Sequence, residues 1–256
     1  MIARSLEYRR DLIAALLIKE LRARYKRTVL GYAWSLLNPL AMAAIYFVLV
    51  NRIFAVQIKN YPLVLVAGLF PWQWVANSVT SSTMVFIANA GLIRRTSFPR
   101  AALLVSATLN DLVHYLASVP VIIGFMLWFG IYPDARWIIF VPLLIVVQWA
   151  VIMGIAFIIS SCNVFFRDLE RITTIGVTLW FYMTPIIYTR DMLSGRHDYL
   201  LIVNPVAGVL LGWRSLFMGE SIDLMLVLCS AVWGAVLLSV GYAFYRRVQW
   251  RFAELV

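Results

Sequence analysis

Long stretches without a charged side chain constrain the fold of this sequence more than any other feature. Such stretches lie between Arg27 and Arg52, Lys59 and Arg94, Arg136 and Arg167, Arg171 and Arg190, and Asp223 and Arg246. A helix needs about 20 apolar residues to cross a hydrocarbon layer about 30 Å thick, and a Lys or Arg at its centre costs about 2.5–3.5 kcal/mol. With 63% hydrophobic and 13% charged residues, the 256-residue chain lies outside the range of soluble domains. The sequence therefore predicts an all-α membrane protein.

Six apolar runs predict six transmembrane helices. The runs are Leu30–Phe54, Gly68–Ala90, Ala101–Phe129, Trp137–Ser161, Ile172–Tyr188 and Leu224–Tyr245. Lys and Arg are enriched on the cytoplasmic side of membrane proteins. A cytoplasmic N-terminus places 16 of the 22 Lys and Arg residues inside, so both termini are expected in the cytoplasm. Anionic membrane lipids then account for the net charge of +10, and nucleic-acid binding is not expected.

Residues 1–28 form a separate unit in this interpretation, ahead of a six-span domain over residues 29–256. Within this unit, Ser5–Arg27 carries Leu and Ile residues at helical spacing and basic residues elsewhere on the helix. The pattern predicts an amphipathic helix in the plane of the membrane interface. Its role is open: it is a membrane anchor, or it docks a cytoplasmic partner through Glu20, Arg22 and Arg24.

One apolar stretch, between the fifth and the last run, is too short to cross a membrane. It reads YLLIVNPVAGVLLGW and is interrupted by Asn204-Pro205 and by Gly208. Apolar runs of about 10–14 residues are more often re-entrant or interfacial than spanning. We therefore expect a hairpin of two short helices over about residues 199–217 that dips into the outer leaflet. A shorter, bent segment is expected at Tyr61–Pro71, before the second span.

No catalytic motif accompanies these runs, so the chain is not expected to be an enzyme. It has no phosphate-binding loop, no metalloprotease motif and no nucleophile elbow, and two histidines cannot form a multi-histidine metal site. Cys162 lies at the end of the fourth run and Cys229 lies in the sixth, so no disulfide and no metal site is expected. Asp111, His114 and Tyr115 share a helix face. They fit either a proton relay within the membrane or an ionisable pair near the cytoplasmic interface.

Polar and aromatic side chains follow one face in two of the predicted spans. They are Ser35, Asn38, Met42, Tyr46 and Leu49 in the first run, and Thr174, Thr178, Phe181, Pro185 and Tyr188 in the fifth. Helix packing through small hydroxyl residues and a belt of interfacial aromatic residues would give part of this pattern. A wide pore would give all of it, because sugar rings stack on aromatic side chains and sugar hydroxyls bond to Asn, Ser and Thr. Both interpretations are open from the pattern alone.

Two short loops on the inside are rich in charged residues. GLIRRTSFPR (Gly91–Arg100) contains Arg94, Arg95, Phe98, Pro99 and Arg100, and NVFFRDLERI (Asn163–Ile172) contains Arg167, Asp168, Glu170 and Arg171. These loops either merely reverse the chain or dock a partner through charge-assisted contacts and an apolar anchor. Asp168 and Glu170 are also the carboxylate pair that a membrane-embedded transferase acting on lipid-linked sugars would need.

Four segments, in this order, resemble the permease subunit of type-2 ABC polysaccharide exporters, the family that exports O-antigen, teichoic acid and related lipid-linked glycans. They are RARYKRTVLGYAWSLLNPL, GLIRRTSFPR, NVFFRDLERI and NPVAGVLLGWRSLFMG, and the resemblance covers nearly the whole chain. It implies an inner-membrane homodimer that carries two separate ABC ATPase subunits. ATP and Mg²⁺ would then bind to those subunits, with no cofactor in this chain.

The resemblance also assigns roles along the chain. The first and fifth spans would form the channel walls, and Gly91–Arg100 would be a coupling or gate helix. An external gate would be formed by the hairpin with Asn204, Pro205, Gly208, Trp213 and Arg214. The predicted function is export of a lipid-linked polysaccharide from cytoplasm to periplasm, driven by ATP hydrolysis on the partner. The alternatives are a type-2 ABC exporter of drugs or small lipids, and the transferase.

Overall fold

All regular secondary structure in the described part of the chain is helical. The computed structural model describes residues 2–24, 33–95, 98–189, 192 and 199–255. Its longer helices are α1 (Ile2–Arg24), α2 (Ala33–Phe47), α3 (Tyr61–Ser82), α6 (Ala101–Trp128), α7 (Trp137–Phe165), α8 (Leu169–Met183), α10 (Ala207–Met218) and α11 (Leu224–Val248). Its shorter ones are the π-helix η1 (Val48–Ile53), α4 (Val85–Ala88), α5 (Ala90–Arg95), α9 (Tyr199–Val203), the 3₁₀ helix η4 (Gln249–Arg251) and α12 (Phe252–Leu255).

Five helical stretches of the described chain are long and apolar enough to cross a membrane. They are Ala33–Ile53, Tyr61–Ser82, Ala101–Trp128, Trp137–Phe165 and Leu224–Arg251. Each overlaps one of the predicted spans. The remaining predicted span is the fifth, Ile172–Tyr188, which contains most of α8, a helix of only 15 residues. At about 1.5 Å per residue, α8 is about 22 Å long and is shorter than the hydrocarbon layer.

The second predicted span, Gly68–Ala90, was placed too late in the sequence. α3 already begins at Tyr61, with Pro62 in its first turn, so the expected bent segment is the first half of a continuous helix that contains Pro71. The helix ends at Ser82 because hydroxyl groups compete with the backbone there. Ser82 Oγ donates to Val79 O at 2.8 Å, and Thr83 Oγ1 donates to Thr80 O at 2.8 Å.

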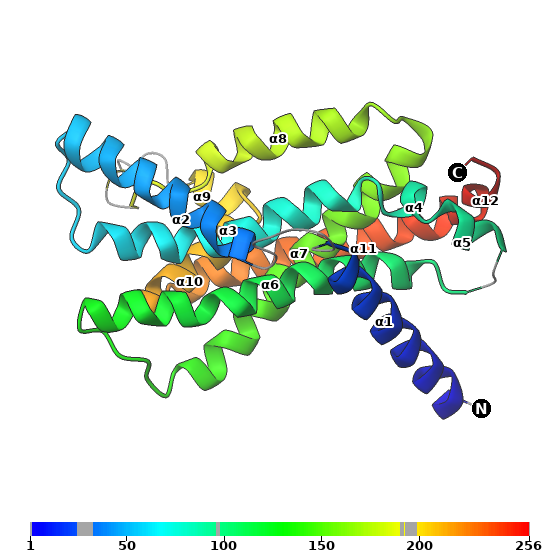
Figure 1. Cartoon of the computed structure of the whole chain (residues 1–256), viewed down its shortest axis with the longest axis horizontal. Coiled ribbons are helices and arrows are strands. Elements are labelled where there is room, and N and C mark those ends of the chain that lie inside the picture. The colour runs from blue at the N-terminus through cyan, green and yellow to red at the C-terminus, as the bar shows by residue number, and fades with distance from the viewer. Residues whose placement is uncertain (1, 25–32, 96–97, 190–191, 193–198, 256) are drawn as a thin grey trace.

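α8 ends where the sequence TPIIY begins. Thr184 is extended, at φ −102° and ψ 139°, as expected for a residue before proline. Pro185 has no N–H to continue the helical hydrogen bonds. Figure 1 shows α8 running along the bundle, from the end that holds both chain termini toward the end that holds α9 and α10. We call these the termini end and the hairpin end.

α7 and α11 approach each other closely through glycine. A Cβ added to Gly241 would collide with the carbonyl oxygen of Gly154, and one added to Gly154 would collide with the backbone of Leu237. Small residues allow this approach between membrane helices, where van der Waals packing is a main source of association. The α7–α11 pair is therefore specified by residues that lack a side chain.

Aromatic side chains connect α3, α6 and α10 inside the bundle. Trp74 stacks on Tyr115 with ring centroids 5.4 Å apart, and Tyr115 meets Trp213 edge-on at 5.3 Å. Trp213 Nε1 donates to Gln148 Oε1 at 2.8 Å, and Gln148 Nε2 donates to Pro71 O at 2.8 Å. The buried amide of α7 thus joins α10 to the proline in α3, and both polar ends of this contact are satisfied.

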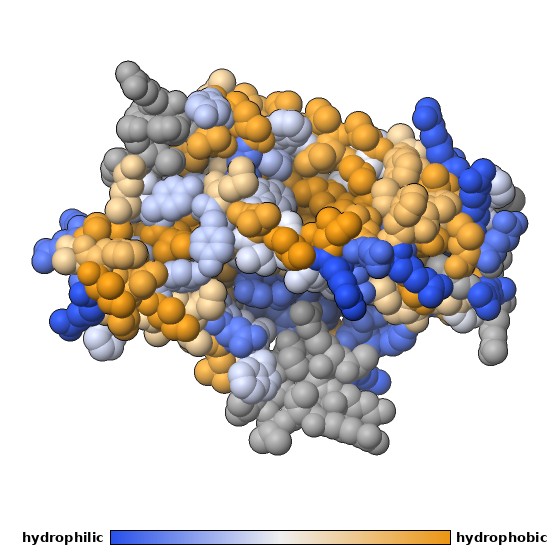
Figure 2. Space-filling view, turned by 90° about the horizontal axis from the view of Figure 1, so that it is seen from above, coloured by the Kyte–Doolittle hydropathy of each residue, from blue (hydrophilic) through white to orange (hydrophobic). Residues whose placement is uncertain are grey.

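The surface of the bundle is apolar over much of its length. Figure 2 shows hydrophobic residues over much of one face and hydrophilic residues at both ends, including the termini end. α1 extends from this end (Figure 1), with Leu16 buried among residues of the bundle, and Lys19 Nζ donates to Asn89 Oδ1 at 2.9 Å. The amphipathic placement of α1 at a lipid interface stays a prediction.

Replacing Gly241 with Ala should destabilise the bundle, because the added methyl group has no room beside Gly154. Overpacking of this kind costs about 1–3 kcal/mol. Gly124 in α6 is the matched control, since a Cβ there meets nothing within 4 Å. Thermal unfolding of the purified protein in detergent should show a lower midpoint for Gly241→Ala and no loss for Gly124→Ala. Equal midpoints for Gly241→Ala and the unchanged protein would contradict this packing.

Candidate functional site

Four consecutive backbone carbonyls after α8 are each bonded by a side chain from another helix. Arg214 of α10 donates to the oxygens of Pro185 at 2.7 Å, Ile186 at 2.7 Å and Tyr188 at 3.0 Å. Tyr61 of α3 donates its hydroxyl to the oxygen of Ile187 at 2.8 Å. We call Pro185–Tyr188 the unwound segment. Its carbonyls would otherwise be unsatisfied in an apolar environment, which is costly.

Arg214 is well placed for this role. Its side chain is only 7% exposed. Gly68 of α3 lies beside the guanidinium, and a Cβ there would come within 3.2 Å of Arg214 Nη2. Arginine presents its N–H donors in a rigid planar fork, so a single side chain can bond several carbonyls. The sequence placed Arg214 in the predicted gate but did not identify the backbone carbonyls or Tyr61 as its neighbours.

The predicted break at Asn204-Pro205 separates α9 from α10, and Asn204 holds the break in place. Its Oδ1 accepts from Trp180 Nε1 at 2.9 Å and from the Val206 N–H at 3.2 Å. Its Nδ2 donates to Thr184 Oγ1 at 2.9 Å. One amide therefore ties the α9–α10 turn to the end of α8. Trp180 and Thr184 are the partners that the sequence did not indicate.

α10 then packs tightly on α11. A Cβ on Gly208 would collide with the carbonyl oxygen of Leu226, and the Val209 N–H donates to Ser230 Oγ at 3.1 Å. Glycine is required by this approach of two backbones. Trp213 is 1% exposed and packs inside the bundle, so it anchors α10 there, and the gate role predicted for it stays a prediction. How deep this hairpin lies in a membrane stays a prediction.

The polar and aromatic stripes of α2 and α8 meet at one aromatic contact. Tyr46 and Phe181 are each 7% exposed, and their ring centroids lie 5.8 Å apart. Trp72 of α3, which the sequence did not single out, lies 5.8 Å from Phe181 and 5.6 Å from Trp180. The two predicted channel walls are thus joined through α3 near the hairpin end.

The rest of the two stripes is mostly open. Asn38, Met42, Thr174 and Thr178 are exposed, and Ser35 and Tyr188 are half-buried. The two threonine hydroxyls donate within α8, to Glu170 O at 3.0 Å and to Thr174 O at 2.9 Å. A hydroxyl bonded in this way still has lone pairs to accept a further hydrogen bond. The channel-lining role of these residues stays a prediction.

The residues predicted to dock a partner lie at the termini end. Arg22, Arg94, Pro99, Arg167 and Asp168 are exposed there, and Glu20 is half-buried. Arg100 Nη1 donates to the carbonyl oxygen of Gln249. Phe98 packs against a core cluster of its own chain, which leaves less of it to enter a partner. The side chains of Arg24 and Arg95 lie outside the described part of the structure.

Asp111 and His114 are buried inside the bundle. Asp111 is 1% exposed and accepts from Ser78 Oγ at 3.1 Å and Ser81 Oγ at 3.5 Å. It also lines a cavity of about 410 Å³ together with Glu20 and Asn110. Among the described residues, no group of three or more His, Cys, Asp or Glu side chains could hold a metal ion.

Known proteins resemble the chain over almost its whole length. The model of a family described as ABC-2 type transporter matches residues 11–218. The O-antigen export system permease protein RfbA of Klebsiella pneumoniae is 40% identical over 98% of this chain and 97% of its own length. The same-named protein of Myxococcus xanthus is 26% identical over 100% and 99%, respectively. The polysialic acid transport protein KpsM of Escherichia coli is 24% identical over 94% of both chains.

The family match therefore runs from α1 to the end of α10 and includes the unwound segment and the hairpin. This stretch holds most of the bundle and the whole polar arrangement around Arg214. The chain belongs to the ABC-2 type transporter family.

Proposed function

We propose that this chain is the permease subunit of an ATP-driven exporter, which moves a lipid-linked, O-antigen-like polysaccharide from the cytoplasm to the periplasm. The observation that carries the proposal is the 40% identity, over 98% of the chain, to a permease named for O-antigen export. The similarity to a polysialic acid transport protein also favours a polysaccharide cargo over drugs or small lipids. A transferase is not favoured, because the carboxylates it would use, Asp168 and Glu170, are exposed at the start of α8.

Six crossings of the inner membrane are part of this proposal. Both termini lie at one end of the bundle (Figure 1), which requires an even number of crossings. The five candidate spans become six when α8 and the unwound segment together form the fifth crossing. Non-helical backbone at membrane depth is tolerated where protein groups satisfy it, and Arg214 and Tyr61 do so here. The basic termini end is then cytoplasmic, and the hairpin is periplasmic.

The polysaccharide would pass between two copies of the chain. Apolar side chains of α8 are uncovered in the single chain, with Ile172, Ile175 and Leu179 each more than 60% exposed. In a homodimer, the open parts of the α2 and α8 stripes would face the passing glycan. Asn38, Thr174 and Thr178 would then offer hydrogen-bonding groups to sugar hydroxyls, and Met42 an apolar contact.

Energy would come from two ATPase subunits that bind ATP and Mg²⁺ and dock at the termini end. The surface for them includes α1 with Arg22, and α5 with Arg94. α12 contacts both α5 and α7 and so links this surface to the spans. A movement of the ATPase would thereby be transmitted to the helices that surround the polysaccharide.

The export function is tested by deleting the gene for this chain in its host. Surface polysaccharide should disappear while lipid-linked polysaccharide accumulates in the cytoplasm, and a plasmid copy should restore the surface polymer. Restoration should fail when the partner ATPase carries a substitution that blocks hydrolysis. Unchanged surface polysaccharide in the deletion strain would contradict the proposal. The polymer is measured by gel electrophoresis of surface and total extracts.

Reversing two exposed charges, Arg94→Glu together with Arg167→Glu, should detach the ATPase. Like charges placed at a docking surface oppose binding, and two reversals should weaken it at least about tenfold. Co-purification of the ATPase and export should fall together, whereas membrane insertion should persist. Arg52→Glu is the control, because Arg52 is an exposed basic residue of η1. Normal co-purification with the doubly reversed chain would refute docking at this surface.

A further inference from the structure

A polar cleft lies at the hairpin end, beside the polar arrangement around Arg214. Its volume is about 850 Å³, within the range of about 300–1,000 Å³ that is usual for small-molecule sites. One wall is the connection between η1 and α3, with Gln57 and Lys59. The other is formed by α10 and the turn before α11, with Ser215, Glu220 and Ser221.

The charges of the cleft balance. Lys59 and Arg214 are cationic, and Glu220 and Asp223 are anionic. Arg214 bonds the unwound segment, and Asp223 Oδ1 accepts from the Met225 N–H at 3.1 Å, so neither charge is uncommitted. The cleft therefore has no excess of positive or negative charge that would attract a strongly charged ligand. The cleft instead offers Lys, Gln and Ser groups that donate, Glu and Gln oxygens that accept, and apolar contacts from Met218 and Ile222.

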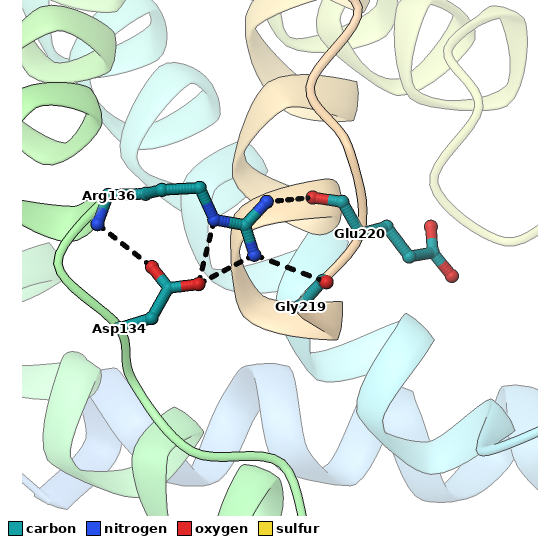
Figure 3. A network of polar contacts seen from close by, with 4 residues as sticks. All are labelled: Asp134, Arg136, Gly219 and Glu220. Atoms are coloured by element: carbon teal, nitrogen blue, oxygen red, sulfur yellow. Dashed lines mark hydrogen bonds and ion pairs between the residues drawn. The ribbon is translucent and has the colours of Figure 1, made fainter.

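One wall of the cleft is held rigid by an arginine from the α6–α7 connection. Arg136 donates to the carbonyl oxygens of Glu220 at 2.9 Å and Gly219 at 3.2 Å, as Figure 3 shows. Asp134 binds the same guanidinium, with Arg136 Nε to Asp134 Oδ2 at 2.7 Å. These hydrogen bonds hold the pKa of the Asp134 carboxyl below its usual range, so the pair is ionised at neutral pH.

This contact also orients Glu220. Gly219 ends α10 in the left-handed conformation at φ 69°, which favours glycine. In Glu220, Arg136 binds the backbone oxygen and not the side chain, and the Glu220 carboxylate points away from the guanidinium (Figure 3). The carboxylate is thus held on a fixed turn and is available to a ligand in the cleft, which Glu220 lines.

We propose that this cleft binds sugar units of the exported polysaccharide at the periplasmic surface. The proposal rests on the proposed function and adds a binding site outside the α2 and α8 stripes. A neutral set of donors and acceptors beside apolar side chains matches sugar rings, which present hydroxyls at their edges and C–H groups on their faces. A phospholipid headgroup would bring a phosphate and would need cationic donors that Arg214 no longer supplies.

The test is photo-crosslinking in cells that export their own polysaccharide. A benzophenone amino acid is placed at Ile222 or, as a second position in the cleft, at Met218. The control position is Ile138 of α7, which is 79% exposed and does not line the cleft. Irradiation should attach polysaccharide to the permease at Ile222 and Met218 but not at Ile138, and no adduct should form when polysaccharide synthesis is blocked.

Side-chain substitutions then test recognition. Gln57→Ala with Glu220→Ala should lower the yield of the adduct by about fivefold to tenfold, since each removed side chain loses hydrogen bonds to the sugar. Arg52→Ala, outside the cleft, should leave the yield unchanged.

The proposal would be overturned by an adduct of phospholipid mass in place of polysaccharide, by equal polysaccharide adducts at all three positions, or by a yield that the substitutions do not change. Export without any adduct in the cleft would also refute it, while leaving the proposed function intact. Unchanged surface polysaccharide in the deletion strain would instead refute the proposed function itself.

Discussion

The arrangement of the hairpin end depends on the hydrogen bonds that the backbone carbonyls of the unwound segment must accept. In a hydrocarbon layer, a backbone oxygen without a partner costs several kcal/mol, so a chain can leave the helical conformation only where protein groups replace the lost bonds. Arg214 and Tyr61 supply four such bonds, to consecutive residues. α10 must therefore lie against the end of α8, and α3 must lie beside both.

The other contacts of the hairpin end follow from this placement. Asn204 joins the α9–α10 turn to Trp180 and Thr184, and Gly208 lets α10 approach α11 closely. Arg136 then binds the carbonyls at the C-terminal end of α10. The hairpin is thus bonded to α8, packed on α11 and tied to the α6–α7 connection.

Charge spacing was sufficient to predict the long spans, because a charged side chain within hydrocarbon is costly wherever the chain folds. The break at Asn204-Pro205 was predictable from local chemistry. The start of α3 at Tyr61, the burial of Trp213 and the acceptors of Arg214 were not, because each depends on residues distant in the sequence. The Arg214–Ile186 bond, for example, joins residues 28 positions apart. Phe98 was predicted as a partner anchor from its loop, but its contact with its own core depends on tertiary packing.

In the proposed topology, α8 and the unwound segment form one crossing of the membrane. This crossing is tested with single cysteines at Arg167, before α8, and at Met192, after the unwound segment, in a chain whose native Cys162 and Cys229 are replaced by Ser. Met192 is exposed, so a cysteine there should react with a membrane-impermeant thiol reagent added to the periplasmic side. A cysteine at position 167 should react only after the inner membrane is permeabilised. Labelling of both positions from the same side would contradict the crossing.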